Sequence, residues 1–271
     1  MATASTPIVI ADLDTFRTAE VEKRLLSHSH LAVDTEFFPG NEGREFSLIQ
    51  IATPEKEVYL FDVLENDELV KQLRGIMTST DILKVMQGCE NDSRMFWQDR
   101  YKWIKLKHVF DTQLTQRILN SMKSGNPINK THLAELCDNY GVTFNRDLKD
   151  ETRLAIEQSH GRYFRSRNTD GSIPEAMKTY AVQDVIVLID LFSRMRSLLE
   201  EDIQPLYSRL INSSLYAGLG GIENRWSYQK DLSLFTKVAR PQLFEEINVN
   251  SDMFERKESF KQDRKGSGRR S

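Results

Sequence analysis

Apolar residues recur along the chain with two different periods, and the period changes where the type of element changes. A first helix, which Asp12 or Asp14 can cap, ends near His28, and short β-type runs separated by turn residues follow it. From residue 65 onward, helical spacing alternates with short apolar runs. The pattern predicts strands over 30–37, 47–52, 58–62, 82–86 and 108–110, and helices over 65–77, 91–101, 112–122, 132–140 and 174–199.

This order of elements predicts the fold class and one main domain. Three strands followed by alternating helices and strands indicate an α/β fold, a mixed five-stranded sheet flanked by helices. We expect a single domain over 1–210, in which the polar stretch 145–172 is assigned no element. Residues 211–271 are expected to be a largely flexible C-terminal extension with a basic tail, because they show little periodicity and end in a charged segment with Gly and Ser.

Composition narrows the class of protein without identifying it. Asp and Glu total 40 against 37 Lys and Arg, and the net charge is -3, so any nucleic-acid contact must be a local basic patch rather than a generally basic surface. Cys89 and Cys137 lie far apart without a C-x-x-C, which argues against a disulfide scaffold or a structural zinc site. We expect an intracellular protein, cytoplasmic or nuclear, with no membrane partner, since no secretory signal or membrane-length apolar run is evident.

Three segments carry acidic residues in positions that suggest chemistry. Asp34 and Glu36 are two apart in a predicted strand and therefore share a face, where they repel each other unless a cation lies between them. Asp92 stands at the start of the helix predicted over 91–101, and Tyr180 and Asp184 are one helical turn apart. Taken singly, each has a simpler interpretation: a solvated acidic pair, a helix cap and a surface pair.

Together, in this order, these segments resemble the DEDDy-type 3′-to-5′ exonucleases, the ribonuclease D and Werner exonuclease group of the ribonuclease H-like superfamily. The resemblance covers about residues 31–192, and the segments Leu48-Ile49-Gln50-Ile51 and Phe110-Asp111-Thr112-Gln113 support it. It implies a ribonuclease H-like sheet whose second strand runs antiparallel to the rest. Thr179 stands where the sister subgroup has a histidine, which favours the tyrosine type.

The resemblance also implies a reaction and its cofactors. Asp34, Glu36, Asp92 and Asp184 would hold two divalent metal ions, Mg²⁺ or Mn²⁺, and Tyr180 would orient the attacking water. The expected activity is removal of nucleoside monophosphates from a single-stranded 3′ end, with RNA favoured over DNA.

Other positions are candidates for binding the nucleic acid. We expect contacts from Phe38, Gln87, Arg162 and Arg165, the two arginines lying in a segment where basic and aromatic residues are interleaved. Many relatives have histidine where Gln87 stands, and a Trp-x-x-Arg-Pro-Leu segment found in ribonuclease D-like members is absent. Asp111 is interpreted mainly as a helix N-cap.

Two alternatives remain open from the sequence. One is a catalytically silent RNA-binding or adaptor module of a small-RNA pathway on the same fold, although such members tend to lose carboxylates that this chain keeps. The other is a DNA-repair exonuclease of the Werner type. No protein partner is indicated by the residues.

Overall fold

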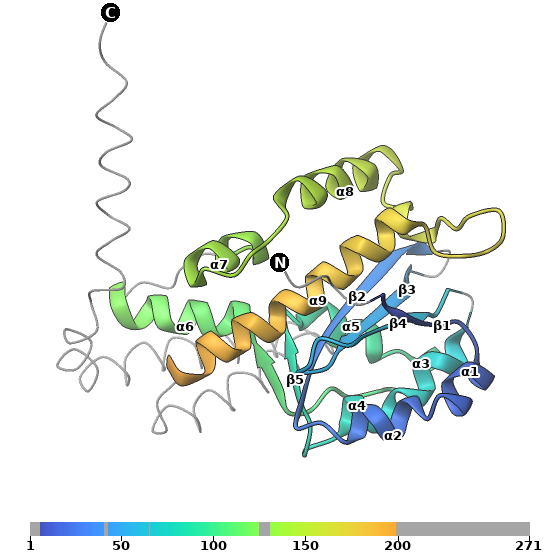
Figure 1. Ribbon diagram of the computed structural model, residues 1–271, viewed down its shortest axis with the longest axis horizontal. Coiled ribbons are helices and arrows are strands. Elements are labelled where there is room, and N and C mark those ends of the chain that lie inside the picture. The colour runs from blue at the N-terminus through green and yellow to red at the C-terminus, as the bar shows by residue number, and fades with distance from the viewer. Residues whose placement is uncertain (1–5, 41–42, 65, 125–130, 199–271) are drawn as a thin grey trace, which may run out of the picture.

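A six-stranded mixed sheet forms the centre of the computed structural model, which describes residues 6–40, 43–64, 66–124 and 131–198 (Figure 1). The strands are β1 (Ile8–Ile10), β2 (His30–Gly40), β3 (Gly43–Ala52), β4 (Val58–Asp62), β5 (Leu83–Met86) and β6 (Val109–Asp111), in the order β1-β4-β3-β2-β5-β6. β3 runs antiparallel to β2 and β4, whereas the β1–β4, β2–β5 and β5–β6 pairs are parallel. The predicted mixed α/β sheet, with its second predicted strand antiparallel, is confirmed.

One strand was not predicted. β1 has three residues and pairs only with β4, at one edge of the sheet. The sequence therefore indicated five strands where the structure has six.

The helices follow the predicted order, but the predicted first helix and those predicted over 65–77 and 91–101 are each divided. Their bounds are α1 (Leu13–Thr18), α2 (Val21–Leu26), α3 (Asp67–Gln72), α4 (Arg74–Thr78), α5 (Glu90–Phe96), η1 (Asp99–Tyr101), α6 (Thr112–Ser124), α7 (Leu133–Tyr140), α8 (Arg146–Gln158), η2 (Tyr163–Arg165), α9 (Glu175–Met195) and η3 (Arg196–Leu198). Asp12 caps α1 by accepting a hydrogen bond from the Thr15 amide at 2.7 Å. Glu20, in the left-handed conformation with φ 48°, separates α1 from α2. α3 and α4 meet at Leu73.

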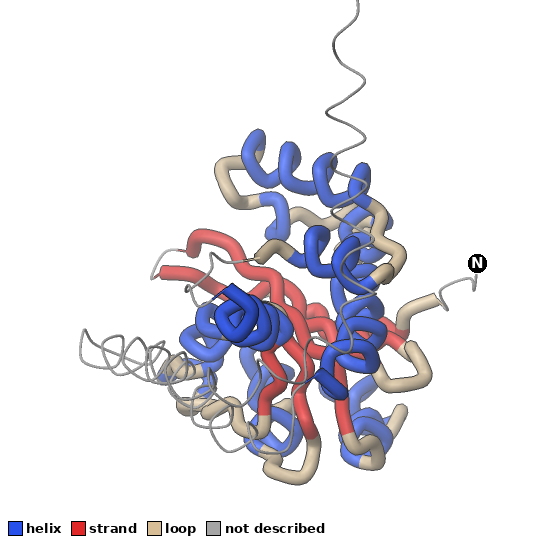
Figure 2. The backbone as a smooth tube through the Cα atoms, turned by 90° about the vertical axis from the view of Figure 1, so that its left-hand side faces the viewer, coloured by secondary structure: helices blue, strands red, loops and turns tan. Residues whose placement is uncertain are grey.

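The helices cover both faces of the sheet (Figure 2). α9 crosses one face and contacts β2, β3, β4 and β5. α1 and α5 lie on the other face, where Phe16 packs against Phe61 with ring centroids 6.3 Å apart and Phe96 against Phe46 at 4.9 Å. This division matters for the site, because α9 and α5 approach the same central strand, β2, from opposite sides.

The stretch left unassigned in the sequence is ordered into α8 and η2. Asn145 caps α8 by accepting a hydrogen bond from the Leu148 amide at 3.2 Å. The predicted extension, 211–271, lies outside the described residues. Among those that are described, no helix is long and apolar enough to cross a membrane.

Candidate active site

The central strand β2 places two carboxylates on the face that α9 covers. Asp34 and Glu36 alternate along the strand with Val33, Thr35 and Phe37, which face the other side. Glu36 is buried, Asp34 is half-buried, and the Gln50 side-chain amide approaches Glu36 Oε1 at 3.5 Å from β3.

α9 brings the third carboxylate to the first two. Asp184 is 2% exposed, and its carboxylate oxygens, with those of Asp34 and Glu36, lie within 4.8 Å of one another. Asp184 Oδ1 is buried without a hydrogen-bond partner among the residues described. Three clustered carboxylates, two buried and one half-buried, with an unsatisfied oxygen form the donor set that a hard divalent cation prefers, so the residues present fit a metal site.

The electrostatics of this carboxylate group (Asp34, Glu36 and Asp184) favour the same interpretation. Burial, followed by the neighbouring Asp184 and Asp92, raises the pKa of Asp34 well above its ordinary value. Burial and the adjacent Asp34 raise the pKa of Glu36 in the same way, and burial raises that of Asp184. These raised pKa values mean that the ionised carboxylates disfavour one another, and a bound cation would favour the ionised forms.

The fourth predicted carboxylate is close by but turned to the other side of β2. Asp92, in α5, is 7% exposed and accepts a hydrogen bond from the Thr35 hydroxyl at 2.5 Å. Burial raises the pKa of Asp92 to about 6, and the Thr35 hydrogen bond opposes that rise. The structure thus brings three of the four predicted ligands together, and Asp92 is joined to them through the strand that carries Asp34 and Glu36.

A lysine that the sequence analysis did not single out lies in the group. Lys149 Nζ donates to Asp184 Oδ2 at 2.6 Å and to the Tyr180 hydroxyl at 2.5 Å. Burial lowers the pKa of Lys149, but the carboxylates outweigh burial and the net shift is upward, so the ammonium is charged. Its helix, α8, is fixed to α9 by two bonds, from the Asn145 amide to Gln183 Oε1 at 2.9 Å and from Gln183 Nε2 to the Asn145 carbonyl at 3.2 Å.

The predicted nucleic-acid contacts have different surroundings. Phe38 is 4% exposed, with the Arg165 guanidinium 5.6 Å from its ring centroid, and Arg162 is exposed at the start of η2. Gln87 is half-buried, and its amide is engaged with the Thr112 hydroxyl and, at 3.0 Å, the Thr131 carbonyl.

Asp111 caps α6, as interpreted from the sequence. Asp111 Oδ1 accepts hydrogen bonds from the Gln113 and Leu114 amides at 2.9 and 3.1 Å. The same carboxylate also accepts the Gly88 and Cys89 amides, each at 3.0 Å. It thereby fixes the connection between β5 and α5, and α5 carries Asp92.

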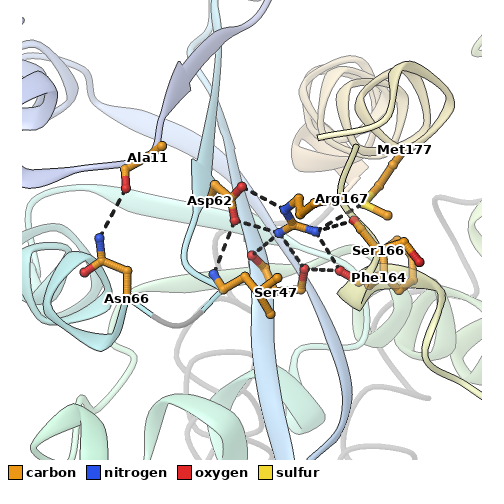
Figure 3. A network of polar contacts seen from close by, with 9 residues as sticks. Ala11, Ser47, Asp62, Asn66, Phe164, Ser166, Arg167 and Met177 are labelled. Atoms are coloured by element: carbon orange, nitrogen blue, oxygen red, sulfur yellow. Dashed lines mark hydrogen bonds and ion pairs between the residues drawn. The ribbon is translucent and has the colours of Figure 1, made fainter. Parts of the chain in front are cut away.

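A buried ion pair holds η2 beside the site (Figure 3). Arg167 donates to both carboxylate oxygens of Asp62, at 2.8 and 2.6 Å, and to the Phe164 carbonyl at 3.0 Å. The Ser47 hydroxyl donates to the same carbonyl, and Phe164 packs against the Tyr180 ring at 5.9 Å. The aromatic residue and the arginine are three positions apart, which is the spacing of the first half of the Trp-x-x-Arg-Pro-Leu segment; the Pro-Leu half is missing.

A ribonuclease H-like sheet with clustered carboxylates defines a class of nucleases, and comparison with known families specifies which. Residues 10–200 match the family described as "3'-5' exonuclease". The match covers well over half of the chain, so the chain belongs to this 3′-5′ exonuclease family and is a hydrolase. The family implies dependence on divalent metal, which the carboxylate group fits.

Solved structures show the same fold. The chain is similar to Trypanosoma brucei RNase D (TM-score 0.66, 18% identity, covering 80% of this chain and 74% of that one) and to the catalytic core of RRP6 from the same organism (0.59, 22%, 81% and 54%). It is also similar to the Aedes aegypti Nibbler EXO domain (0.56, 20%, 81% and 99%). Comparison with curated proteins found no match.

Proposed function

We propose that the chain removes nucleoside monophosphates from the 3′ end of single-stranded nucleic acid, with RNA favoured over DNA. The observation that carries this proposal is the convergence of Asp34, Glu36 and Asp184 beside Tyr180 and Lys149. A structure of Trypanosoma brucei RNase D, which shares the fold, is a complex with RNA U12, and this supports the preference for RNA.

The carboxylates would be the metal ligands. Two ions, Mg²⁺ or Mn²⁺, held by Asp34, Glu36, Asp92 and Asp184, would activate water and neutralise charge on the phosphate. Asp92 now accepts a hydrogen bond from Thr35, and its side chain would have to turn toward Asp34 to complete the set.

Tyr180 acts by orientation rather than as a base. Burial, followed by the carboxylates of Glu36 and Asp184, raises the pKa of Tyr180 above its ordinary value, so the hydroxyl keeps its proton. Its oxygen accepts a hydrogen bond from Lys149 and its O–H bonds to the Asp184 carboxylate, so the phenol is fixed beside the carboxylates, where it would orient a water molecule or a phosphate oxygen. Lys149, which bonds to Asp184 and Tyr180, would provide a positive charge for the scissile phosphate.

Phe38, Gln87, Arg162 and Arg165 remain the proposed contacts for the terminal nucleotides. Arg165, exposed in η2, is the clearest of these, because its guanidinium can meet a phosphate while the buried Phe38 ring, 5.6 Å away, supports it. The alternative of a silent adaptor is not favoured, since the acidic side chains converge as a metal site requires.

The test is a side-by-side digestion of single-stranded RNA and DNA of one sequence, with Mn²⁺ or Mg²⁺ and a label at the 5′ end. The expected products shorten from the 3′ end and release 5′-monophosphates, faster for RNA. Asp184→Asn should abolish cleavage, while Asp14→Asn, at a position that is 94% exposed, should leave it unchanged. Failure of the wild type to shorten either strand would contradict the proposal.

A further inference from the structure

A surface on the α5 side of the sheet carries aromatic and basic groups that the catalytic site does not use. Trp97 and Trp103 meet edge to face with ring centroids 5.6 Å apart, and Trp103 is 49% exposed. Residues 97–107 include four basic side chains and one acidic one, in a chain whose net charge is -3. This tryptophan-lysine surface (Trp97, Lys102, Trp103, Lys105 and Lys107) is therefore a local basic patch of the kind that an acidic nuclease needs.

The segment after η1 presents these groups in a regular way. Ile104 and Leu106 are buried, at 0% and 2% exposure, while Trp103 and Lys107 are exposed and Lys105 is half-exposed. Ile104 and Leu106 therefore pack inward, while the Trp103 ring and the ammonium groups of Lys105 and Lys107 remain toward solvent. The arrangement suits a ligand that offers flat rings and negative charges in sequence.

The turn that presents Trp103 is held in a conformation that L-residues rarely adopt. Lys102 and Trp103 have φ angles of 58° and 56°, both left-handed. The Gln98 carbonyl accepts the Tyr101 and Trp103 amides, each at 3.0 Å, and Arg74 Nη2 donates to the Lys102 carbonyl. Two consecutive strained residues persist only where surrounding bonds fix them, so the exposed ring is positioned rather than loosely attached.

The tryptophan-lysine surface is connected to the strand that carries the catalytic carboxylates. Phe37, which follows Glu36 in β2, stands opposite Phe46 of β3. The Phe46 ring packs against Phe96, which precedes Trp97, at 4.9 Å and against Tyr101, which precedes the turn, at 5.1 Å. These contacts place the tryptophan-lysine surface behind the strand that carries Asp34 and Glu36, on the face of the sheet opposite to α9.

We infer that the tryptophan-lysine surface binds the single-stranded nucleic acid upstream of the 3′ end that is being cut. Trp103 stacks on a base, and Lys102, Lys105 and Lys107 contact the phosphates. The identity of the ligand rests on the proposed function, but binding to the tryptophan-lysine surface requires no metal and no cleavage. The occupant is a single strand because stacking needs exposed base faces, which a duplex keeps within its own stack.

Binding is measured without metal, so that cleavage plays no part. Tryptophan fluorescence is titrated with single strands of about 4 and about 12 nucleotides in EDTA, in a Trp226→Phe background that leaves Trp97 and Trp103 to report. The longer strand should quench the signal and bind more tightly. Trp103→Ala should weaken its binding about tenfold, Trp103→Phe should restore most of the loss, and neither should affect the shorter strand.

Lysine removal and activity provide independent measurements. Lys102→Ala/Lys107→Ala should lower the slope of log affinity against log salt by about 1.4, that is about 0.7 per cation for a single strand. The matched controls are Arg17→Ala/Lys23→Ala on α1 and α2 for charge, and Val9→Ala on β1, at the opposite edge of the sheet, for apolar exposure. With Mn²⁺, Trp103→Ala should raise KM for the longer strand and leave kcat unchanged.

Two outcomes separate this inference from the proposed function. Equal affinity of wild type and Trp103→Ala for the longer strand, with Asp184→Asn still abolishing cleavage, would overturn the inference alone. Quenching that depends on Trp103 in a protein that cuts neither RNA nor DNA would support the surface and contradict the nuclease proposal. Binding of duplex as tightly as single strand would also overturn the inference.

Discussion

Replacing Lys149 with methionine should have opposite effects on metal binding and on cleavage. In the metal-free protein the ammonium bonds to Asp184 at 2.6 Å and to Tyr180 at 2.5 Å, and its charge also opposes the rise in pKa of Asp34 and Glu36. Methionine keeps the length of the chain but removes the charge and both bonds. A divalent cation approaching Asp184 must displace or oppose the ammonium in the wild type but not in the variant.

The magnitude follows from the geometry. A hydrogen bond to a charged group contributes about 1.5–3 kcal/mol. The Lys149 side chain is 35% exposed, so water screens the pair, and about 2 kcal/mol is the appropriate value. The metal-free variant should then melt roughly 4–8 °C below the wild type, since about 1 kcal/mol shifts a domain of this size by about 2–4 °C. The same 2 kcal/mol corresponds to roughly thirtyfold tighter binding of Mn²⁺.

Calorimetric titration with Mn²⁺, melting curves with and without the ion, and kcat on a short single strand make up the assay. We expect tighter binding of Mn²⁺, a melting temperature that the ion restores almost to that of the wild type, and a lower kcat through loss of the phosphate contact. Lys178→Met is the control, because that lysine makes an equally short ion pair, 2.6 Å, with the exposed Glu175. A variant that binds Mn²⁺ no more tightly than the wild type would refute the competition between ammonium and metal.

Three further changes test other parts of the site. Thr35→Val removes the hydrogen bond that opposes the rise in pKa of Asp92, which is already about 6. The acid limb of the pH–rate profile should therefore move to higher pH. An unmoved limb would show that ionisation of Asp92 does not control the rate at low pH. Asp62→Asn leaves Arg167, whose side chain is 11% exposed, without its charge partner. The free energy of unfolding measured in urea should fall by about 3 kcal/mol. A fall below about 1 kcal/mol would mean that water already screens the pair. Lys84 is buried, and its pKa is lowered from 10.5 to about 7. Between these two pH values the unfolded state binds one more proton than the folded state, so the free energy of unfolding should rise with pH. Lys84→Met should flatten that rise, and parallel curves of unfolding free energy against pH for the two proteins would contradict the reasoning.

Sequence periodicity was enough to find the elements that carry the acidic residues. Alternation put Asp34 and Glu36 on one face, and the four-residue spacing put Tyr180 and Asp184 on one turn, because strand and helix geometry fix these relations locally. How Asp92 is turned depends on its hydrogen bond to Thr35, a contact across 57 positions that no local pattern contains. The sequence therefore predicted the set of carboxylates but not its division between two faces.

Lys149 was missed for a different reason. α8 fully buries only Thr152, while Leu148 and Ile156 are only partly buried against the core, so its apolar stripe is narrow. The helix is also positioned by polar contacts, those of Gln183 and of its own cap, Asn145. The spacing of Phe164 and Arg167 was visible in the sequence, but phenylalanine in place of tryptophan and the missing Pro-Leu obscured it.

The segment Asp34-Thr35-Glu36 serves both faces of the sheet, and this makes the register of β2 a condition for the whole site. Asp34 and Glu36 point to Asp184 on α9, while Thr35 holds Asp92 on α5. A slip of one residue would exchange the faces and bury both carboxylates against α5. The irregularity between Glu36 and Phe37 occurs where β3 has an additional residue, Ser47, since Glu36 stands opposite Leu48 and Phe37 opposite Phe46. Ser47 in turn donates a hydrogen bond to the Phe164 carbonyl in η2. The contact that holds η2 beside the site therefore also fixes the strand register on which the carboxylates depend.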